Sequence, residues 1–416
     1  MRVHLFDPQL SGHGGHYLNH DAQLVRDLHR RGIEVLLYGR KGATVTVEGL
    51  VPKPTFSQDI FQEAAADPAV WAMENFHAIN DATFADLATL PREQFASTDL
   101  IYLPNLLQNQ LHGVARWLAT LPEENRPAVA VMLRYLNHAM DYVQARANKE
   151  LIALYYRFAA KALQAIQPRM LLCADTRELA KAYQQITGLP VLELPNPMEV
   201  SSLLNSSATE AKSAGAAPVI LYQGHTSPLR GFHFLPDLID RCAKLTPRPR
   251  FVVQVQNRAG AAASGLSATL TRLDRIAATP GAGLRLVEGA LEAADYYALL
   301  AEADIVVLPY SPSFYGVGSS GVFTEAASVG KVVVVSPNTV PARQGAEYGL
   351  GVVAATKWDP ASMAEAVSTA LRTLPELQAK ARVGAPRFRA EQCASALWDK
   401  VFAALSALKP SVPVAA

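Results

Sequence analysis

The stretch RVHLFDPQLSGHGGHYLNHDAQLVRDLHRRGIEVLLY, residues 2–38, indicates the fold. Its apolar start, Arg2–Phe6, predicts a strand, and Tyr17–Arg31 has the period of an amphipathic helix. The apolar face of that helix carries Leu18, Ala22, Val25 and Leu28. Gly32 ends the helix, and Glu34–Tyr38 is the next apolar run. A strand, a helix and a strand at this spacing form a βαβ unit, so we expect a parallel sheet.

The rest of the chain continues this alternation in two series. Further strands of the first series are predicted at Leu100–Leu103, Ala128–Leu133 and Met170–Cys173. Strands of the second series are predicted at Val219–Tyr222, Phe251–Gln256, Leu284–Val287, Ile305–Leu308 and Val332–Val335. Between the series, residues 198–217 are small and polar, which is typical of a linker. The pattern predicts an α/β protein with two Rossmann-like domains that face a central cleft.

The expected domains are residues 1–200, 201–385 and a C-terminal helix and tail at 386–416. The first domain carries a segment rich in aromatic residues, roughly Pro54–Asp86, which we predict to be a helical insertion. The last helix is predicted at about Ala390–Leu408, and we expect it to pack back on the first domain. In open α/β sheets, ligands bind at the carboxyl ends of the strands, so the loops there are the candidates for chemistry.

Composition limits the classes of function. The chain has 416 residues and a net charge of +1, which gives no reason to expect nucleic acid as a partner. The three cysteines are far apart, and this spacing indicates neither a disulfide framework nor a zinc site. The amino terminus lacks an apolar signal sequence, and no apolar run would span a membrane. We expect a cytoplasmic protein; peripheral membrane contact and the oligomeric state stay open.

The first candidate loop, Ser11–Tyr17, joins the first strand to the first helix. Its glycines let the backbone approach a phosphate or a sugar, although a tight turn alone would explain them. His13, His16 and His20 also suggest a metal, but the cluster has no carboxylate in sequence, and we expect no metal site. Contact of His13 or His16 with substrate or with a leaving phosphate is the favoured interpretation.

The second candidate loop, Gly224–Gly231, follows the strand Val219–Tyr222. Arg230 is a cation beside a glycine at the end of a strand, where it can neutralise a diphosphate as negative charge develops on it. The alternative is an arginine that is simply exposed to solvent.

The third candidate loop runs from Pro309 into a helix and is centred on Ser319–Glu325. The first backbone N–H groups of that helix can bind phosphate oxygens, and they belong to Ser320, Gly321 and Val322. Glu325 lies one turn further on, and its carboxylate can accept the two hydroxyl donors of a ribose. The alternative is that Glu325 only favours the positive end of the helix. We expect Glu325 to lie at the cleft.

These loops together resemble the GT-B glycosyltransferases of family 4, also called glycosyl transferases group 1, over nearly the whole chain. The segments that carry the resemblance occur in the family's order and spacing: Gly14-Gly15, Leu194–Met198, Gly224–Gly231, Tyr297–Tyr310 and Glu325–Val335. The resemblance implies a donor diphosphate at Arg230 and a ribose at Glu325. It implies phosphate contacts from Ser320, Gly321 and Val322, and a glycine near the donor phosphate at Gly15. Further substrate contacts are expected from His13, Gly14, Gly224, His225, Tyr310, Val317, Ser319 and Asn196.

The chain departs from the family pattern at four places. At one of them, Arg230 stands where the family has Lys, which keeps the charge but changes the geometry. The first Glu of the family's paired-glutamate motif falls on Val317, which puts recognition of the donor sugar in doubt. His225 replaces a family Arg, so one fixed cation is lost or becomes dependent on pH. The family's N-domain histidine has no clear match; Arg134 or His138 takes that place, and we favour His138.

The resemblance implies transfer of a sugar from a nucleoside-diphosphate sugar, with retention at the anomeric carbon and without a metal or other cofactor. Arg230, His138 and His16 are the expected catalytic residues. The acceptor, which the first domain would bind, is a glycan, a lipid or a small molecule. Alternatives are a non-catalytic partner subunit or nucleotide-binding module of the same fold and, less favoured, an epimerase.

Overall fold

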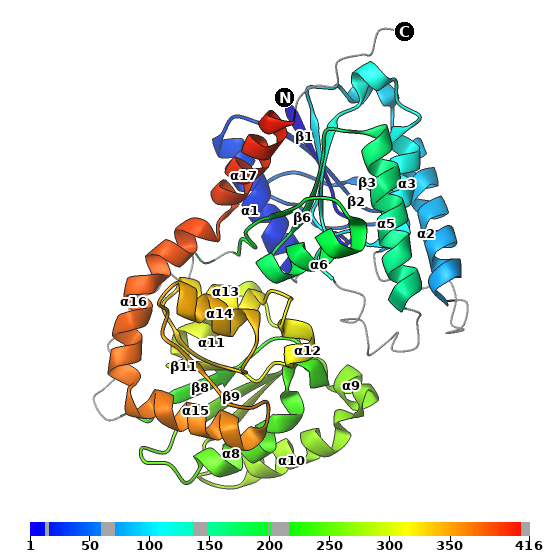
Figure 1. Cartoon of the computed structure of the whole chain (residues 1–416). Coiled ribbons are helices and arrows are strands. Elements are labelled where there is room, and N and C mark those ends of the chain that lie inside the picture. The colour runs from blue at the N-terminus through cyan, green and yellow to red at the C-terminus, as the bar shows by residue number, and fades with distance from the viewer. Residues whose placement is uncertain (13–15, 60–70, 136–148, 199, 201–215, 409–416) are drawn as a thin grey trace. The chain divides into compact units, whose positions relative to one another are not determined.

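The computed structural model describes residues 1–12, 16–59, 71–135, 149–198, 200 and 216–408. The chain divides into two compact units. Unit 1 comprises Met1–Pro197 and Cys393–Ala416, and unit 2 comprises Met198–Gln392. Each unit contains one parallel sheet with helices packed on it, as Figure 1 shows. The prediction of an α/β protein with two Rossmann-like domains is confirmed.

The sheet of unit 1 has seven strands in the order β3-β2-β1-β4-β5-β6-β7. The strands are β1 (Arg2–Phe6), β2 (Glu34–Arg40), β3 (Lys53–Phe56), β4 (Leu100–Leu103), β5 (Ala128–Met132), β6 (Met170–Ala174) and β7 (Val191–Glu193). Strand β1 lies between β2 and β4, in parallel register with both. The carboxyl ends of β1, β4, β5 and β6 therefore form one continuous edge.

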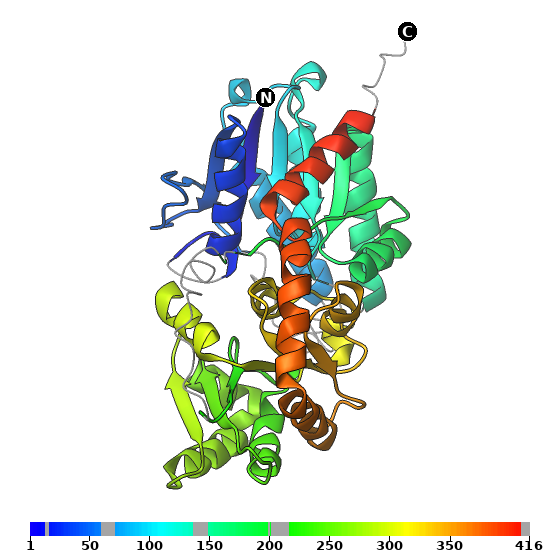
Figure 2. The same ribbon diagram turned by 90° about the vertical axis from the view of Figure 1, so that its left-hand side faces the viewer.

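The helices of unit 1 pack on both faces of its sheet. They are α1 (His16–Arg30), α2 (Trp71–Ala88), α3 (Gln108–Leu118), α5 (Lys149–Ile166), α6 (Arg177–Thr187) and α17 (Ala394–Ala407), with short 3₁₀ turns at Arg92–Gln94 and Glu123–Asn125. Helices α2, α3 and α5 lie side by side (Figure 1). Helix α17, red in both views, packs against α1 (Figure 2). Its Trp398 is fully buried and donates its indole N–H to the Leu24 carbonyl at 3.2 Å, so the C-terminal helix packs on the first domain as expected.

One local prediction was wrong, and the start of another helix is shifted. The segment predicted to be helical from Pro54 begins with strand β3, because Lys53–Phe56 pairs in parallel with β2 at the edge of the sheet. An edge strand tolerates Pro54. Residues 60–70 of this segment lie outside the described part, and the helix proper is α2. The helix predicted at about Ala390–Leu408 is α17, and it begins later than predicted because α16 (Leu374–Glu391) ends before it and Cys393 caps α17.

The sheet of unit 2 has six strands in the order β10-β9-β8-β11-β12-β13. The strands are β8 (Val219–Tyr222), β9 (Arg250–Val255), β10 (Leu284–Glu288), β11 (Ile305–Leu308), β12 (Val332–Val335) and β13 (Val352–Ala354). Every residue of β8, β11 and β12 is buried. Parallel strands covered on both faces are apolar throughout, which explains the sequences VILY, IVVL and VVVV.

The helices of unit 2 connect these strands. They are α8 (Leu235–Cys242), α9 (Arg258–Ala261), α10 (Ser267–Ala278), α11 (Ala293–Glu302), α12 (Pro312–Tyr315), α13 (Gly321–Ser328), α14 (Val340–Glu347), α15 (Pro360–Arg372) and α16. Short 3₁₀ turns lie at Pro228–Arg230 and Phe232–Phe234, and a π turn lies at Ala262–Leu266. Throughout the described residues, no helix combines the length and apolar character needed to cross a bilayer. All three cysteines are free.

Candidate functional site

The loop after β8 packs directly on the segment after β11. Gly231 has a φ of +68°, and a Cβ atom there would lie 1.9 Å from the Pro309 carbonyl oxygen, so only glycine fits. The backbone N–H of Ser311 donates to the Leu229 carbonyl at 2.8 Å. These contacts bring Arg230 to the carboxyl edge of the sheet, beside the loop that leads to α13.

One N–H donor group of Arg230 has no acceptor among the described residues at this edge. Its Nη1 atom is buried and has no hydrogen-bond partner among the described residues. A Cβ atom on Gly224 would lie only 2.7 Å from Nη1, so this glycine makes room for the guanidinium. The guanidinium carbon lies 5.9 Å from the ring centre of Tyr310. An arginine stays charged at any working pH, so the site holds a permanent cation with an unused N–H.

The amino end of α13 lies at the same place. The Ser320 hydroxyl caps the helix by accepting the Phe323 N–H at 3.1 Å. Helix geometry leaves the N–H groups of Gly321 and Val322 without intrahelical acceptors. A Cβ atom on Gly224 would lie 3.3 Å from Val322 Cγ2, so the helix end and the Arg230 guanidinium flank the same glycine. A helix end and a guanidinium together favour an anion.

Glu325 is buried, with 1% of its surface exposed. The Tyr296 hydroxyl donates to its Oε2 atom at 2.7 Å. Burial raises the pKa of Glu325 to about 8, against the opposing effects of the Tyr296 hydrogen bond and of Arg230. The alternative of a simple helix-end role does not describe this carboxyl, because Ser320 caps α13 and Glu325 binds a tyrosine from α11.

His225 does not replace the family's fixed cation at neutral pH. Its Nδ1 atom lies 3.1 Å from Gln256 Oε1. Burial, together with the charge of Arg230, lowers the pKa of His225 below its usual value. At Val317, where the resemblance implies a Glu, the side chain is apolar, and the backbone N–H donates to the Phe314 carbonyl at 3.4 Å.

The structure also shows polar groups at this edge that sequence reasoning missed. Gln223 follows β8 directly, and Ser336 follows β12 directly. The side-chain oxygen and nitrogen of Gln223 and the hydroxyl of Ser336 are buried without a partner in the described part of the chain. Their signal in the sequence is a polar residue placed immediately after an apolar strand.

At the carboxyl edge of unit 1, Arg134 follows β5 and is held by several groups. Its Nε donates to the Pro104 carbonyl at 2.9 Å and its Nη1 to Asn196 Oδ1 at 2.8 Å. Asp175 Oδ2 lies 3.6 Å from Nη1. Two predicted residues, Arg134 and Asn196, are thus in contact. Several other predicted site residues, namely His13, Gly14, Gly15 and His138, lie outside the described residues, and the side chain of His16 is not described.

His20 belongs to the same cluster. It is 4% exposed, its Nε2 lies 2.6 Å from Arg134 Nη2, and its Nδ1 lies 3.4 Å from Asp21 Oδ1. Both ring nitrogens are therefore engaged within the protein. Within the described ranges, no three or more His, Cys, Asp or Glu side chains gather in a way that could hold a metal ion.

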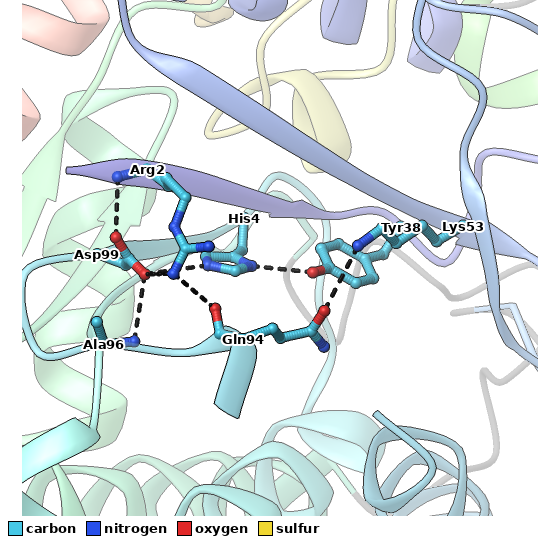
Figure 3. Close-up of polar contacts among 7 residues, drawn as sticks. All are labelled: Arg2, His4, Tyr38, Lys53, Gln94, Ala96 and Asp99. Carbon is cyan, nitrogen blue, oxygen red and sulfur yellow. Dashed lines mark hydrogen bonds and ion pairs between the residues drawn. The ribbon is translucent and has the colours of Figure 1, made fainter. Parts of the chain in front are cut away.

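A second buried histidine lies at the opposite, amino edge of this sheet (Figure 3). His4 Nδ1 lies 3.0 Å from the Tyr38 hydroxyl, and Nε2 lies 3.5 Å from Asp99 Oδ2. Arg2 forms an ion pair with the same Asp99 at 2.8 Å. Burial lowers the pKa of His4 to about 4, so the ring is neutral at pH 7. This network connects β1 to the turn before β4 and lies away from the carboxyl edge of the sheet.

The sequence matches no protein-family model and no curated protein. Solved structures, however, match the fold over almost the whole chain. HepE from Anabaena in complex with UDP has a TM-score of 0.63 at 15% identity and covers 98% of this chain and 100% of its own. A trehalose-6-phosphate synthase from E. coli bound with UDP-2-fluoro glucose has a TM-score of 0.72 at 11% identity, with coverage of 99% and 100%.

The catalytic domain of starch synthase IV from Arabidopsis thaliana, bound to ADP and acarbose, has a TM-score of 0.63 at 11% identity, with coverage of 97% and 99%. These likenesses show that the chain has the GT-B fold of two Rossmann-like domains.

Proposed function

We propose that the chain is a glycosyltransferase that uses a nucleoside-diphosphate sugar, and that unit 2 binds the nucleotide. The observation that carries the proposal is the buried Nη1 atom of Arg230, which has no partner among the described residues. It lies beside Gly224, and the side chain of Val322, at the start of α13, flanks the same glycine. A cation and a helix end that flank the same glycine form a setting suited to a diphosphate.

The proposed mechanism stabilises the leaving group. As the glycosidic bond breaks, negative charge grows on the nucleoside diphosphate, and preorganised donors at that position lower the barrier. Arg230, Gly321 and Val322 supply such donors. We further propose that the sugar is transferred with retention and without a metal, as the resemblance implies, because this route relies on the leaving group more than on a strong base.

Glu325 is the proposed ribose contact. A carboxylate accepts two hydroxyl donors, and the Tyr296 hydroxyl already orients one of its oxygens. The sugar end of the donor is less defined, because Val317 replaces a carboxylate there. HepE and starch synthase IV were solved with UDP and ADP, so UDP- and ADP-sugars are the first donors to test.

We propose that unit 1 binds the acceptor, which is a glycan, a lipid or a small molecule. Its carboxyl edge presents Arg134, Asn196 and the start of α1. We also propose that the protein works in the cytoplasm, which its three free cysteines favour, with peripheral membrane contact as one route to a lipid acceptor.

A donor screen tests this function. Release of free sugar and nucleotide is followed with UDP-, ADP-, GDP- and dTDP-sugars at fixed protein concentration. We expect turnover with one nucleotide class, and loss of at least 100-fold in Arg230→Met. The control Arg272→Met also removes a charge from unit 2, at a surface ion pair with Asp240, and should stay within twofold. The absence of nucleotide binding would favour the partner-subunit alternative, whereas binding without turnover with any donor would leave the acceptor as the missing component.

A further inference from the structure

Four polar side chains form a buried chain at the carboxyl edge of unit 1. Asp7 follows β1, His20 and Asp21 lie on α1, and Arg134 follows β5. Asp7 and Asp21 are fully buried, His20 is 4% exposed, and the Arg134 side chain is 12% exposed. Buried charges are costly unless they are paired, so the arrangement of protons among these groups is strongly constrained.

The two carboxyl groups share a proton. The side chains of Asp7 and Asp21 are in hydrogen-bond contact. A carboxylate can only accept, so one of the two must carry a proton. Asp7 accepts the Gln9 N–H at 2.7 Å and the Asn105 amide at 3.5 Å. Asp21 Oδ2 has no donor among the described residues. Asp7 is therefore the ionised partner, and Asp21 carries the proton.

The next contact fixes the tautomer of His20. A guanidinium only donates, so Nε2 of His20, 2.6 Å from Arg134 Nη2, must accept. The ring proton then sits on Nδ1 and points to Asp21 Oδ1 at 3.4 Å. Burial, followed by the charge of Arg134, lowers the pKa of His20 well below its usual value, which keeps the ring neutral.

The chain ends on Arg134, whose guanidinium is also tied to Pro104, Asn196 and Asp175. Among the described residues, Tyr102 from β4 and Cys173 from β6 are further titratable groups near this cluster. We propose that Asp7, Asp21 and His20 are positioning residues that hold the Arg134 guanidinium for the transfer step. The proposal rests on the function proposed above and adds a residue set on the acceptor side.

Two substitutions at Asp21 distinguish a positioning role from a role as a proton acceptor or a metal ligand. Asp21→Asn imitates the protonated acid, because its amide can donate to Asp7 while its oxygen accepts from His20. Asp21→Leu has the same size but breaks both contacts. Positioning predicts that the Asn variant behaves like the native protein. If Asp21 served as a proton acceptor or a metal ligand, Asn would be as damaging as Leu.

Side-chain ¹H–¹⁵N spectra of the full chain report directly on the contacts among Asp21, His20 and Arg134. His20 should show a neutral ring with the proton on Nδ1 from pH 5.5 to 8, in the native protein and in Asp21→Asn. The Arg134 Nε–H should exchange with water at least tenfold faster in Asp21→Leu and His20→Leu, but not in His20→Gln, which keeps an acceptor. His4→Gln, at the opposite edge, is the matched control and should leave Arg134 unchanged. A His20 ring that titrates in this range, or Asn and Leu variants that behave alike, would overturn the proposal.

The catalytic consequence has its own test. With the donor found by the screen, His20→Leu and Arg134→Lys should lower kcat at least tenfold and change the donor KM less than threefold, and His20→Gln should restore most of the loss. An unchanged kcat in His20→Leu would overturn the proposal. If the native protein binds no nucleotide, the proposed function fails, but the spectra still show whether Asp21 and His20 position the Arg134 guanidinium. If Asp21→Leu does not fold, the Asn and His20 variants carry the test.

Discussion

The raised pKa of Glu325 predicts how strongly nucleotide binding should depend on pH. Its carboxyl is buried, and its pKa of about 8 lies well above the ordinary 4.5. At pH 7 the group is therefore mostly protonated in the free protein. If the ribose hydroxyls need the carboxylate as acceptor, binding must release a proton. The variant Glu325→Gln keeps the shape and the contact with Tyr296 but cannot ionise.

The magnitude follows from the ionised fraction, which rises from about 1% at pH 6 to about half at pH 8. The affinity for UDP should then increase about fiftyfold over this range through Glu325. The nucleotide has its own titration, so the quantity to compare is the difference between native protein and Glu325→Gln. Calorimetry at several pH values, in two buffers of different ionisation enthalpy, measures both affinity and proton release. Identical pH dependence of the two proteins would refute the reasoning.

The same carboxyl has an effect on stability, with a definite sign. Its pKa is higher in the folded state than in the unfolded state. Its favourable contribution is thus complete below pH 4.5 and is lost as the pH rises toward 8. Relative to Glu325→Gln, the native protein should lose about 3 kcal/mol of unfolding free energy between pH 4 and pH 7. Denaturant titrations of both proteins check this number.

Three further predictions concern the framework. Gly231→Ala should destabilise unit 2 by at least about 2 kcal/mol in denaturant titrations, because the backbone is left-handed there and the new Cβ would overlap Pro309; a silent substitution would contradict the packing. Trp398→Ala should cost about 3–5 kcal/mol, whereas the exposed Lys400→Ala should cost almost nothing. In the folded protein His4 has a pKa of about 4 and is neutral at pH 7, whereas in the unfolded chain the His4 ring takes up a proton below about pH 6.5. The native protein should therefore lose about 3 kcal/mol between pH 7 and pH 4, and His4→Gln should flatten this dependence.

The sequence predicts the elements whose signal is local. Runs such as Ile305–Leu308 and Val332–Val335 are apolar on both faces, and the predicted bounds match the strands. The edge strands β3, β7 and β13 are three or four residues long, and pairing with a neighbour, rather than their own composition, makes them extended. The break before α17 likewise depends on a cap and on packing against α1.

The candidate site divides in the same way. Arg230 precedes Gly231 in the loop after a strand, and Ser320 stands at the start of a helix. Both features are visible in the local sequence, so it identifies these residues as candidates. The pairing of Tyr296 with Glu325 spans 29 positions, and that of His20 with Arg134 spans 114. Such contacts are set by strand order and register, which no local pattern encodes. The environment of Glu325 has the same cause, since its carboxyl pairs with a tyrosine from another helix.

Isothermal calorimetry of nucleotide binding to native protein, Arg230→Met and Arg272→Met tests the central claim most directly. UDP, ADP, GDP and dTDP are titrated at one pH and one salt concentration. We expect one of them to bind the native protein, Arg272→Met to bind it with an affinity within twofold of the native value, and Arg230→Met to lose at least 100-fold in affinity. Binding that survives in Arg230→Met, or the absence of binding to native protein, would contradict a diphosphate site at this edge.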